Sequence, residues 1–167
     1  FLQNTTGYIV GTKSEQAGMI KHGSKMIQAV QNIDVPRITM MTGASFGAGN
    51  YGMCGRGFDP DFLYTLPNAK MGVMGGEQAA KTMSMVARGK AEALGETPDE
   101  AALAQTEAML AAHFDGQSDA FYTSGHMMDD GMIDPRQMRN TLGMLLETVR
   151  EARYRSLRPN SFGVARL

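Results

Sequence analysis

The chain has 167 residues, of which 43% are hydrophobic, and its formal net charge at pH 7 is −1. This length and apolar fraction predict one globular domain, and the near-neutral charge without a Lys and Arg block favours neither a nucleic acid nor a membrane surface as partner. No apolar run reaches the roughly 20 residues of a membrane span, and the single Cys54 excludes an intrachain disulfide and favours a reducing, intracellular compartment.

The N-terminal region predicts a helix followed by a buried strand. Residues 14–31 place apolar side chains at helical spacing, with Ser14 as the N-cap. The stretch "RITMMTG", residues 37–43, lacks the alternation of a half-exposed strand and indicates a buried one. Glycines are then dense from Gly43 to Gly57. A strand therefore runs into a glycine-rich turn where a helix can begin.

The same scheme repeats further along the chain. Residues 62–66, "FLYTL", predict an extended segment, and Pro67 with Asn68 predict a turn. A strand at residues 70–74 then leads to Gly75 and Gly76, which open a helix from Glu77. Two successive units of strand, glycine turn and helix predict an α/β architecture.

The second half of the chain predicts mainly helices. Residues 88–116 are rich in Ala and Glu and predict a long, exposed helical insertion, with Thr97 as N-cap, Pro98 in the first turn and Gly116 at the C-terminal end. A short helix and turn follow, and residues 136–156 predict an amphipathic helix whose basic residues match the helix dipole. The tail, residues 157–167, has no clear period. Most of the 15 methionines fall at expected core positions.

The ionisable side chains form no recognised catalytic or metal pattern. The histidines lie in three separate contexts, at His22, His113 and His126. None is beside Cys54 or a serine in a known nucleophile motif, so nucleophilic catalysis lacks support. Three aspartates are close together, at Asp129, Asp130 and Asp134. Their Gly and Pro neighbours favour a turn with capping carboxylates, so no metal site is predicted.

The glycine-rich turn allows a dinucleotide-binding interpretation. Gly47, Gly49 and Gly52 match the pattern G-x-G-x-x-G after a strand. A Rossmann unit also needs an acidic residue about 20 residues further on, at the end of the next strand. No acid occurs in "NAKMGVMGG", and Glu77 lies in the helix that follows. A Rossmann-type domain therefore stays an alternative, although the acidic residue that it requires is missing.

The other interpretation is a site for a developing oxyanion. Ala48 and Gly49 would direct their N–H groups from the first turn of a helix into a cleft. Close packing of a helix on a strand also needs glycine, and it explains Gly52, Gly55 and Gly57 well. For Ala48 and Gly49 the pattern alone leaves both interpretations open.

Four motifs, "SFGAGNYGMCGR", "PNAKMGVMGGEQAA", "DDGMIDP" and "SFGVARL", resemble the carboxy-terminal half of the carboxyltransferase (β) subunit of biotin-dependent acyl-CoA carboxylases. The chain is most similar to the 3-methylcrotonyl-CoA and geranyl-CoA carboxylase branch. The resemblance runs from Phe1 to Leu167 and is weakest over residues 88–120. It implies a crotonase-like α/β fold of repeated ββα units, in which residues 1–167 are the carboxy-terminal domain of a longer chain and the acyl-CoA-binding amino-terminal domain lies outside it.

The resemblance also implies an activity and partners. The family moves a carboxyl group from carboxybiotin, carried by a biotin carboxylase and biotin carrier α subunit, to an acyl-CoA. In this branch the acceptor is the γ carbon of a branched enoyl-CoA. The active site forms between β subunits of a homo-oligomer, in the bacterial cytoplasm or the mitochondrial matrix, and this domain needs no metal. A non-catalytic assembly domain of the same fold is a further alternative.

Site residues carry over by motif. The N–H groups of Ala48 and Gly49 would bind the ureido oxygen of biotin, and Phe46 and Gly47 would shape the same wall. Two further glycines, Gly75 and Gly76, would open a second helix toward the cleft. The resemblance implies that biotin itself takes the γ proton, which agrees with the lack of a plausible base in the sequence.

Overall fold

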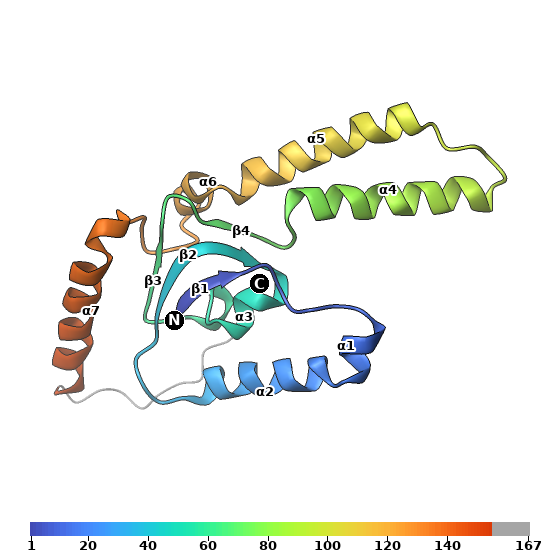
Figure 1. The fold of residues 1–167 in the computed structure, drawn as a ribbon. Helices are drawn as coiled ribbons and strands as arrows, with labels where there is room; N and C mark the ends of the chain where they lie inside the picture. The colour runs from blue at the N-terminus through green and yellow to red at the C-terminus, as the bar shows by residue number, and fades with distance from the viewer. Residues whose placement is uncertain (155–167) are drawn as a thin grey trace.

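The computed structural model describes residues 1–154, which form a small parallel sheet surrounded by helices (Figure 1). The elements in chain order are β1 (Leu2–Thr5), α1 (Thr12–Gln16), α2 (Met19–Asn32), β2 (Ile38–Phe46), α3 (Gly47–Gly52), the 3₁₀ helix η1 (Arg56–Phe58), β3 (Phe62–Thr65), β4 (Lys70–Gly72), α4 (Gly76–Ala93), α5 (Glu100–Ser118), α6 (Ala120–Gly125), the 3₁₀ helix η2 (Pro135–Gln137) and α7 (Met138–Arg153).

The central strand of the sheet is β2, and all its pairings are parallel. Strand β1 lies along one edge of β2. The other edge is shared, because β3 pairs with the first half of β2 and β4 pairs with its last residues, where Phe46 is opposite Gly72. The succession β3, β4 and α4 is one ββα unit, which confirms the predicted α/β class.

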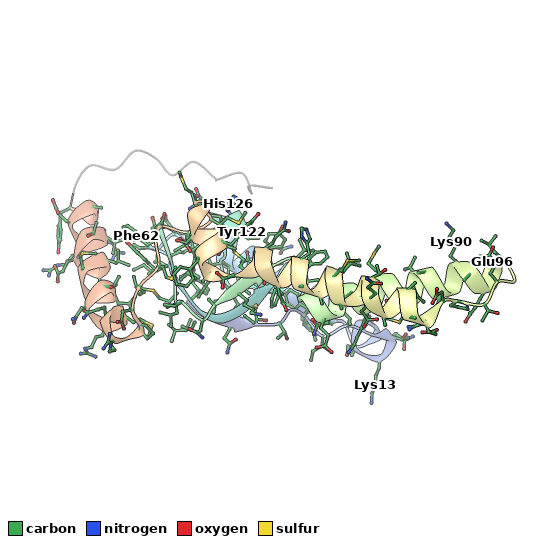
Figure 2. The ribbon with its side chains drawn as sticks, turned by 90° about the horizontal axis from the view of Figure 1, so that it is seen from above. Lys13, Phe62, Lys90, Glu96, Tyr122 and His126 are labelled. Carbon is green, nitrogen blue, oxygen red and sulfur yellow. The ribbon has the colours of Figure 1, made fainter. Side chains whose placement is uncertain are left out.

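The core of the described chain is small. Met41, Leu63 and Ala69 pack together and are almost fully buried, with Met71 against them. Helices α4 and α5 form a hairpin that projects away from the sheet (Figure 1). Seen from above, Lys90 and Glu96 lie at its far end (Figure 2).

Many methionines lie on the surface of the described residues. On the hairpin, Met83, Met85 and Met109 are 55%, 62% and 60% exposed. The prediction that most methionines lie in the core is therefore wrong, because eight of the 15 are exposed: Met26, Met74, Met83, Met85, Met109, Met127, Met128 and Met144. The expected exposure of the helical insertion is confirmed, because Ser118 is the one buried residue of α5.

Most predicted elements are confirmed with shifted ends. Strand β2 extends to Phe46, three residues beyond the predicted segment, and α4 begins at Gly76 as expected. The predicted helix 14–31 is wrong as one element, because Gly18 adopts a left-handed conformation with φ 94° and separates α1 from α2. Ser14 consequently lies inside α1 and caps nothing, since the N-cap is Gly11. The tail 157–167 lies outside the described residues.

The N-cap of α5 also differs from the prediction. The cap is Asp99, whose Oδ1 accepts hydrogen bonds of 3.1 Å from the N–H groups of Ala101 and Ala102. Thr97 lies upstream of the helix, and Gly116 lies inside it, with α5 ending at Ser118. A carboxylate near the positive end of the helix dipole is favoured over a hydroxyl further upstream, which explains the choice of cap.

Asp99→Ala is expected to lower stability because it removes both of these hydrogen bonds. Loss of an N-cap typically costs about 1 kcal/mol, which in a domain of this size lowers the unfolding midpoint by about 2–4 °C. The midpoint is measured by thermal unfolding of the protein that contains this chain. Thr97→Ala is the matched control and is expected to leave the midpoint unchanged; an equal loss in both variants would contradict the assignment of the cap.

Candidate functional site

Two helices begin at one edge of the sheet. Strands β2 and β4 are parallel neighbours that end at Phe46 and Gly72; α3 follows β2 directly, and α4 begins after a short turn at residues 73–75. The aromatic ring of Phe46 lies against Gly72, where an added Cβ would be 3.4 Å from it. The structure therefore brings all the sequence-predicted site residues to the carboxyl ends of these two strands: Phe46, Gly47, Ala48, Gly49, Gly75 and Gly76.

The α3 turn, residues 46–49, begins a helix whose N-cap makes no side-chain hydrogen bond. Phe46 is the extended N-cap residue and makes no capping hydrogen bond through its side chain. Gly47 adopts φ 55°, and a Cβ there would lie 3.1 Å from the carbonyl oxygen of Val73, so only glycine fits without strain. Ala48 and Gly49 occupy the second and third helical positions, whose N–H groups have no acceptor inside a helix. These two N–H groups, like that of Gly47, therefore have no acceptor within α3.

The two donor residues differ in their surroundings. Ala48 is exposed, whereas Gly49 is buried. A Cβ on Gly49 would lie 3.0 Å from both Gly7 Cα and the side chain of Thr5. The absence of a side chain at position 49 is therefore also required for packing against the segment that follows β1.

The remaining glycines of the turn have packing roles. A Cβ on Gly52 would clash with the hydroxyl of Tyr8, and one on Gly55 would clash with the side chain of Asn50. Both glycines are thus explained by close contacts, which confirms the interpretation made from the sequence. Val73 and Asn50, which contact the turn, were not identified from the sequence.

At the start of α4, Gly76 is buried against α5. An added Cβ would lie 2.6 Å from the carbonyl oxygen of Ala111 and 3.0 Å from Oδ1 of Asp115. Glu77 in the first turn hydrogen bonds to Lys81, and this contact lowers the pKa of the Glu77 carboxyl. Glu77 is thus the acidic residue in the first turn of α4, where the helix dipole favours negative charge.

The aspartates of the loop after α6 are engaged in hydrogen bonds. Asp129 accepts from Ser124 and Gly131, Asp130 accepts from Leu63 N, and Asp134 caps η2. The prediction of a capping carboxylate is confirmed for Asp134, whereas Asp129 bonds within the loop and Asp130 ties the loop to β3. Within residues 1–154, no group of three or more His, Cys, Asp or Glu side chains is arranged to hold a metal ion. In the same range, no helix has the length and apolar character needed to cross a bilayer.

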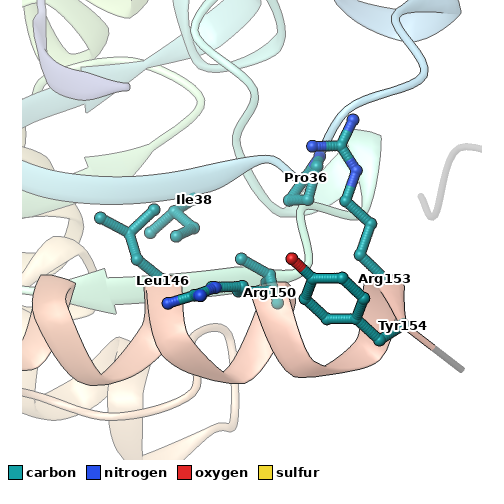
Figure 3. Close-up of a pocket in the computed structure, with 7 residues that line it drawn as sticks. Pro36, Ile38, Leu146, Arg150, Arg153 and Tyr154 are labelled. Carbon is teal, nitrogen blue, oxygen red and sulfur yellow. The ribbon is translucent and has the colours of Figure 1, made fainter.

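A groove of about 560 Å³ lies elsewhere, between the start of β2 and α7 (Figure 3). Its lining includes Pro36, Ile38, Arg150 and Tyr154. Ile38 is the first residue of β2 and Phe46 the last, so this groove is separated from the α3 turn by roughly 25 Å along the strand. The backbone donors follow the opposite end of β2, and the size of the groove alone is no reason to assign it to the same site.

Cys54 is expected to be unreactive in the native protein. Its side chain is fully buried, and burial raises the pKa of the thiol. A raised pKa keeps the sulfur protonated at pH 8, and the thiol is a poor nucleophile. We expect almost no alkylation of Cys54 by iodoacetamide at pH 8 in the folded protein and full alkylation in denaturant, measured by peptide mass spectrometry. Rapid labelling in the folded state would contradict the burial of this thiol.

Comparison with known proteins gives one consistent result. Residues 1–162 match the family model described as carboxyl transferase domain. The chain is 49% identical over 167 residues to a probable biotin-dependent acyl-coenzyme A carboxylase beta2 subunit of Mycobacterium tuberculosis, covering 100% of the chain and 31% of that protein. It is 41% identical over 169 residues to the mitochondrial methylcrotonoyl-CoA carboxylase beta chain of Arabidopsis thaliana, covering 100% of the chain and 28% of that protein.

Solved structures agree. The P. aeruginosa geranyl-CoA carboxylase beta subunit superposes with a TM-score of 0.85 at 50% identity, over 100% of this chain and 31% of that one. The transcarboxylase 12S crystal structure, a hexamer assembly with hydrolysed methylmalonyl-coenzyme A bound, superposes with a TM-score of 0.74 at 27% identity, over 96% of this chain and 29% of that one. The chain thus spans about 30% of the length of these relatives.

Proposed function

The chain belongs to the carboxyl transferase domain family, and from that premise we propose that residues 1–167 are the carboxy-terminal domain of the carboxyltransferase (β) subunit of a biotin-dependent acyl-CoA carboxylase. The family resemblance and the crotonase-like α/β fold expected from the sequence are both confirmed. The observation that carries the proposal is the family match over residues 1–162, together with backbone donors at the α3 turn.

The proposed acceptor is the γ carbon of a branched enoyl-CoA, such as 3-methylcrotonyl-CoA or geranyl-CoA. Similarity to carboxylase β subunits of both kinds supports this choice. We assign the acyl-CoA to the amino-terminal domain outside this chain, and carboxybiotin to a partner α subunit. A homo-oligomer of β subunits follows by analogy with the hexamer of the transcarboxylase 12S subunit, and the proposed location is the bacterial cytoplasm or the mitochondrial matrix.

Two features of the α3 turn support a role in binding the ureido group of biotin. Ala48 is exposed, and the N-cap residue Phe46 makes no side-chain hydrogen bond to the first N–H groups of the helix. In this proposal the N–H groups of Ala48 and Gly49 donate to the ureido oxygen, while Phe46 and Gly47 line the same wall. Gly75 and Gly76 contribute the start of the neighbouring helix α4, which comes after β4, the strand adjacent to β2. When bound, carboxybiotin would supply the carboxyl group, and its ureido oxygen would accept these two hydrogen bonds.

The chain's contribution to the reaction is hydrogen bonding and orientation. Among residues 1–154, the groups nearest to a Cβ added at Gly47 or Gly49 belong to Val73, Thr5 and Gly7, none of which is an acid or a base. Two N–H donors at the start of a helix stabilise negative charge that develops on an oxygen, and each such donor typically contributes about 3 kcal/mol to lowering the barrier. Oriented amides can therefore favour carboxyl release without an ionisable side chain at the turn.

The proposal is tested with the complete carboxylase that contains this chain. The enzyme is assembled with its biotin-carrying subunit, ATP and bicarbonate, and offered 3-methylcrotonyl-CoA, geranyl-CoA, acetyl-CoA and propionyl-CoA. We expect acyl-dependent ATP turnover to be fastest with a branched enoyl-CoA. Turnover with acetyl-CoA or propionyl-CoA only would overturn the assigned branch, and no turnover with any ester would overturn carboxyl transfer.

The dinucleotide-binding alternative is not retained. The chain belongs to a different family, and the G-x-G-x-x-G pattern does not precede a long helix but forms the whole of α3, which is 6 residues long. The Ala48→Pro variant distinguishes the proposed function from the remaining alternative, a non-catalytic assembly domain of the same fold.

A further inference from the structure

A polar network lies directly beneath the α3 turn. It joins Gln3 of β1, Ser45 of β2 and Asn50 of α3. Gln3 Nε2 donates to Ser45 Oγ at 2.9 Å, and Asn50 Nδ2 donates to the same oxygen at 2.7 Å. Gln3 and Ser45 are both 0% exposed, and Asn50 is half-buried. Burial of polar groups is costly unless they are paired, and among the described residues Gln3 Oε1 has no partner, so the network depends on the two bonds that Ser45 Oγ accepts.

The bond between Asn50 and Ser45 closes a ring around the turn. The backbone from Ser45 to Asn50 contains the whole α3 turn, including the proposed donors Ala48 and Gly49. Gly47 within this ring has no side chain and a left-handed conformation, so it restrains the backbone little by itself. A restraint from outside the turn is therefore needed to fix the direction of the two N–H groups.

The side chain of Asn50 is held from the opposite side as well. Gly55 lies so close that an added Cβ would overlap the Asn50 side-chain amide, and Gly55 N donates to the backbone carbonyl oxygen of Asn50 at 2.8 Å, which fixes the main chain at this position. Gln3 in turn fixes the Ser45 hydroxyl from the neighbouring strand. The network thus ties the start of α3 to both β1 and β2.

We propose that Asn50 is a positioning residue for carboxyl transfer, which fixes the N–H groups of Ala48 and Gly49 through its hydrogen bond to Ser45. This inference rests on the proposed function. Donors stabilise a developing charge only when they are already oriented toward it, and a supporting hydrogen bond usually supplies that orientation. Asn50 itself needs no contact with biotin or with the acyl-CoA.

The kinetic test uses Asn50→Ala, Ser45→Ala and the double variant in the complete carboxylase. We expect Asn50→Ala to lower kcat about tenfold, a fraction of the 10²–10³-fold loss typical of a deleted donor. The KM for the acyl-CoA should stay within about twofold, because this turn does not hold that substrate. The double variant should be no slower than the slower single variant, since both substitutions break one shared bond.

Asn68→Ala is the matched control. The Asn68 side chain also donates one hydrogen bond to β2, at 3.1 Å to the carbonyl oxygen of Thr42, but it lies in the β3–β4 turn. It should leave kcat unchanged. A kcat for Asn50→Ala equal to that of the unsubstituted enzyme, an equal loss in Asn68→Ala, or additive losses in the double variant would each overturn the inference.

A second measurement does not depend on activity. Hydrogen–deuterium exchange of peptides covering residues 46–50 should accelerate in Asn50→Ala and remain unchanged in Asn68→Ala, because the released turn opens more often. Unchanged exchange in Asn50→Ala would overturn the restraint. If the unsubstituted enzyme transfers no carboxyl group to any ester, the proposed function fails, whereas the exchange result still decides whether Asn50 holds the turn.

Discussion

Replacing Ala48 with proline is expected to lower kcat for carboxyl transfer by about 10²–10³-fold, because proline deletes one of the two proposed N–H donors. The loss should occur in a folded protein. Ala48 is exposed and lies in the first turn of α3, where its N–H has no acceptor in the helix and where proline is tolerated. Single-turnover kinetics of the complete carboxylase measure the effect on the transfer step.

A matched proline substitution separates this effect from backbone damage. Ile20 is 70% exposed and occupies the equivalent second position of α2. We expect Ile20→Pro to retain kcat within about twofold, because α2 contributes no donor to the proposed site. Gly49→Pro is unsuitable, since Gly49 is in close contact with Thr5 and Gly7. Undiminished transfer by a correctly folded Ala48→Pro enzyme would favour the non-catalytic assembly domain.

The position of the turn could be predicted from the sequence because local chemistry determines it. A continuous apolar segment predicts a buried strand, and glycines directly after it allow the chain to reverse into a helix. These signals placed Phe46, Gly47, Ala48 and Gly49 at the start of α3. The network that supports them was not predictable in this way. Gln3 and Ser45 are 42 positions apart, and only the pairing of β1 with β2 brings them into contact.

The wrong predictions have two physical causes. Both Thr97 and Asp99 are good N-cap residues, so propensity alone allows either one, and the structure chooses the carboxylate that reaches two N–H groups. A helical apolar pattern, in turn, indicates that a face is hydrophobic but not whether the rest of the chain covers it. Met83 and Met85 on α4 remain exposed, and for such side chains tertiary packing decides the outcome.

Gly76→Ala is expected to lower the stability of the domain by about 2 kcal/mol, a typical cost of overpacking. The new methyl group would lie 2.6 Å from the carbonyl oxygen of Ala111, and because this oxygen belongs to the backbone of α5, one of the two helices has to move. For a domain of this size, the unfolding midpoint should fall by about 4–8 °C. Gly89→Ala in the same helix has open space around it and should instead stabilise by about 0.5–1 kcal/mol.

The same variant distinguishes packing from ligand contact at the start of α4. Displacement of α4 would move the preceding segment, in which the carbonyl oxygen of Val73 lies against Gly47. If Gly76 serves packing, kcat and the unfolding midpoint should fall together, and a second substitution that restores the midpoint should restore much of kcat. If Gly76 contacts biotin directly, kcat should fall at an unchanged midpoint, because the methyl group would then exclude the cofactor without separating the helices. A lower unfolding midpoint with an unchanged kcat would show that Gly76 is not part of the proposed site.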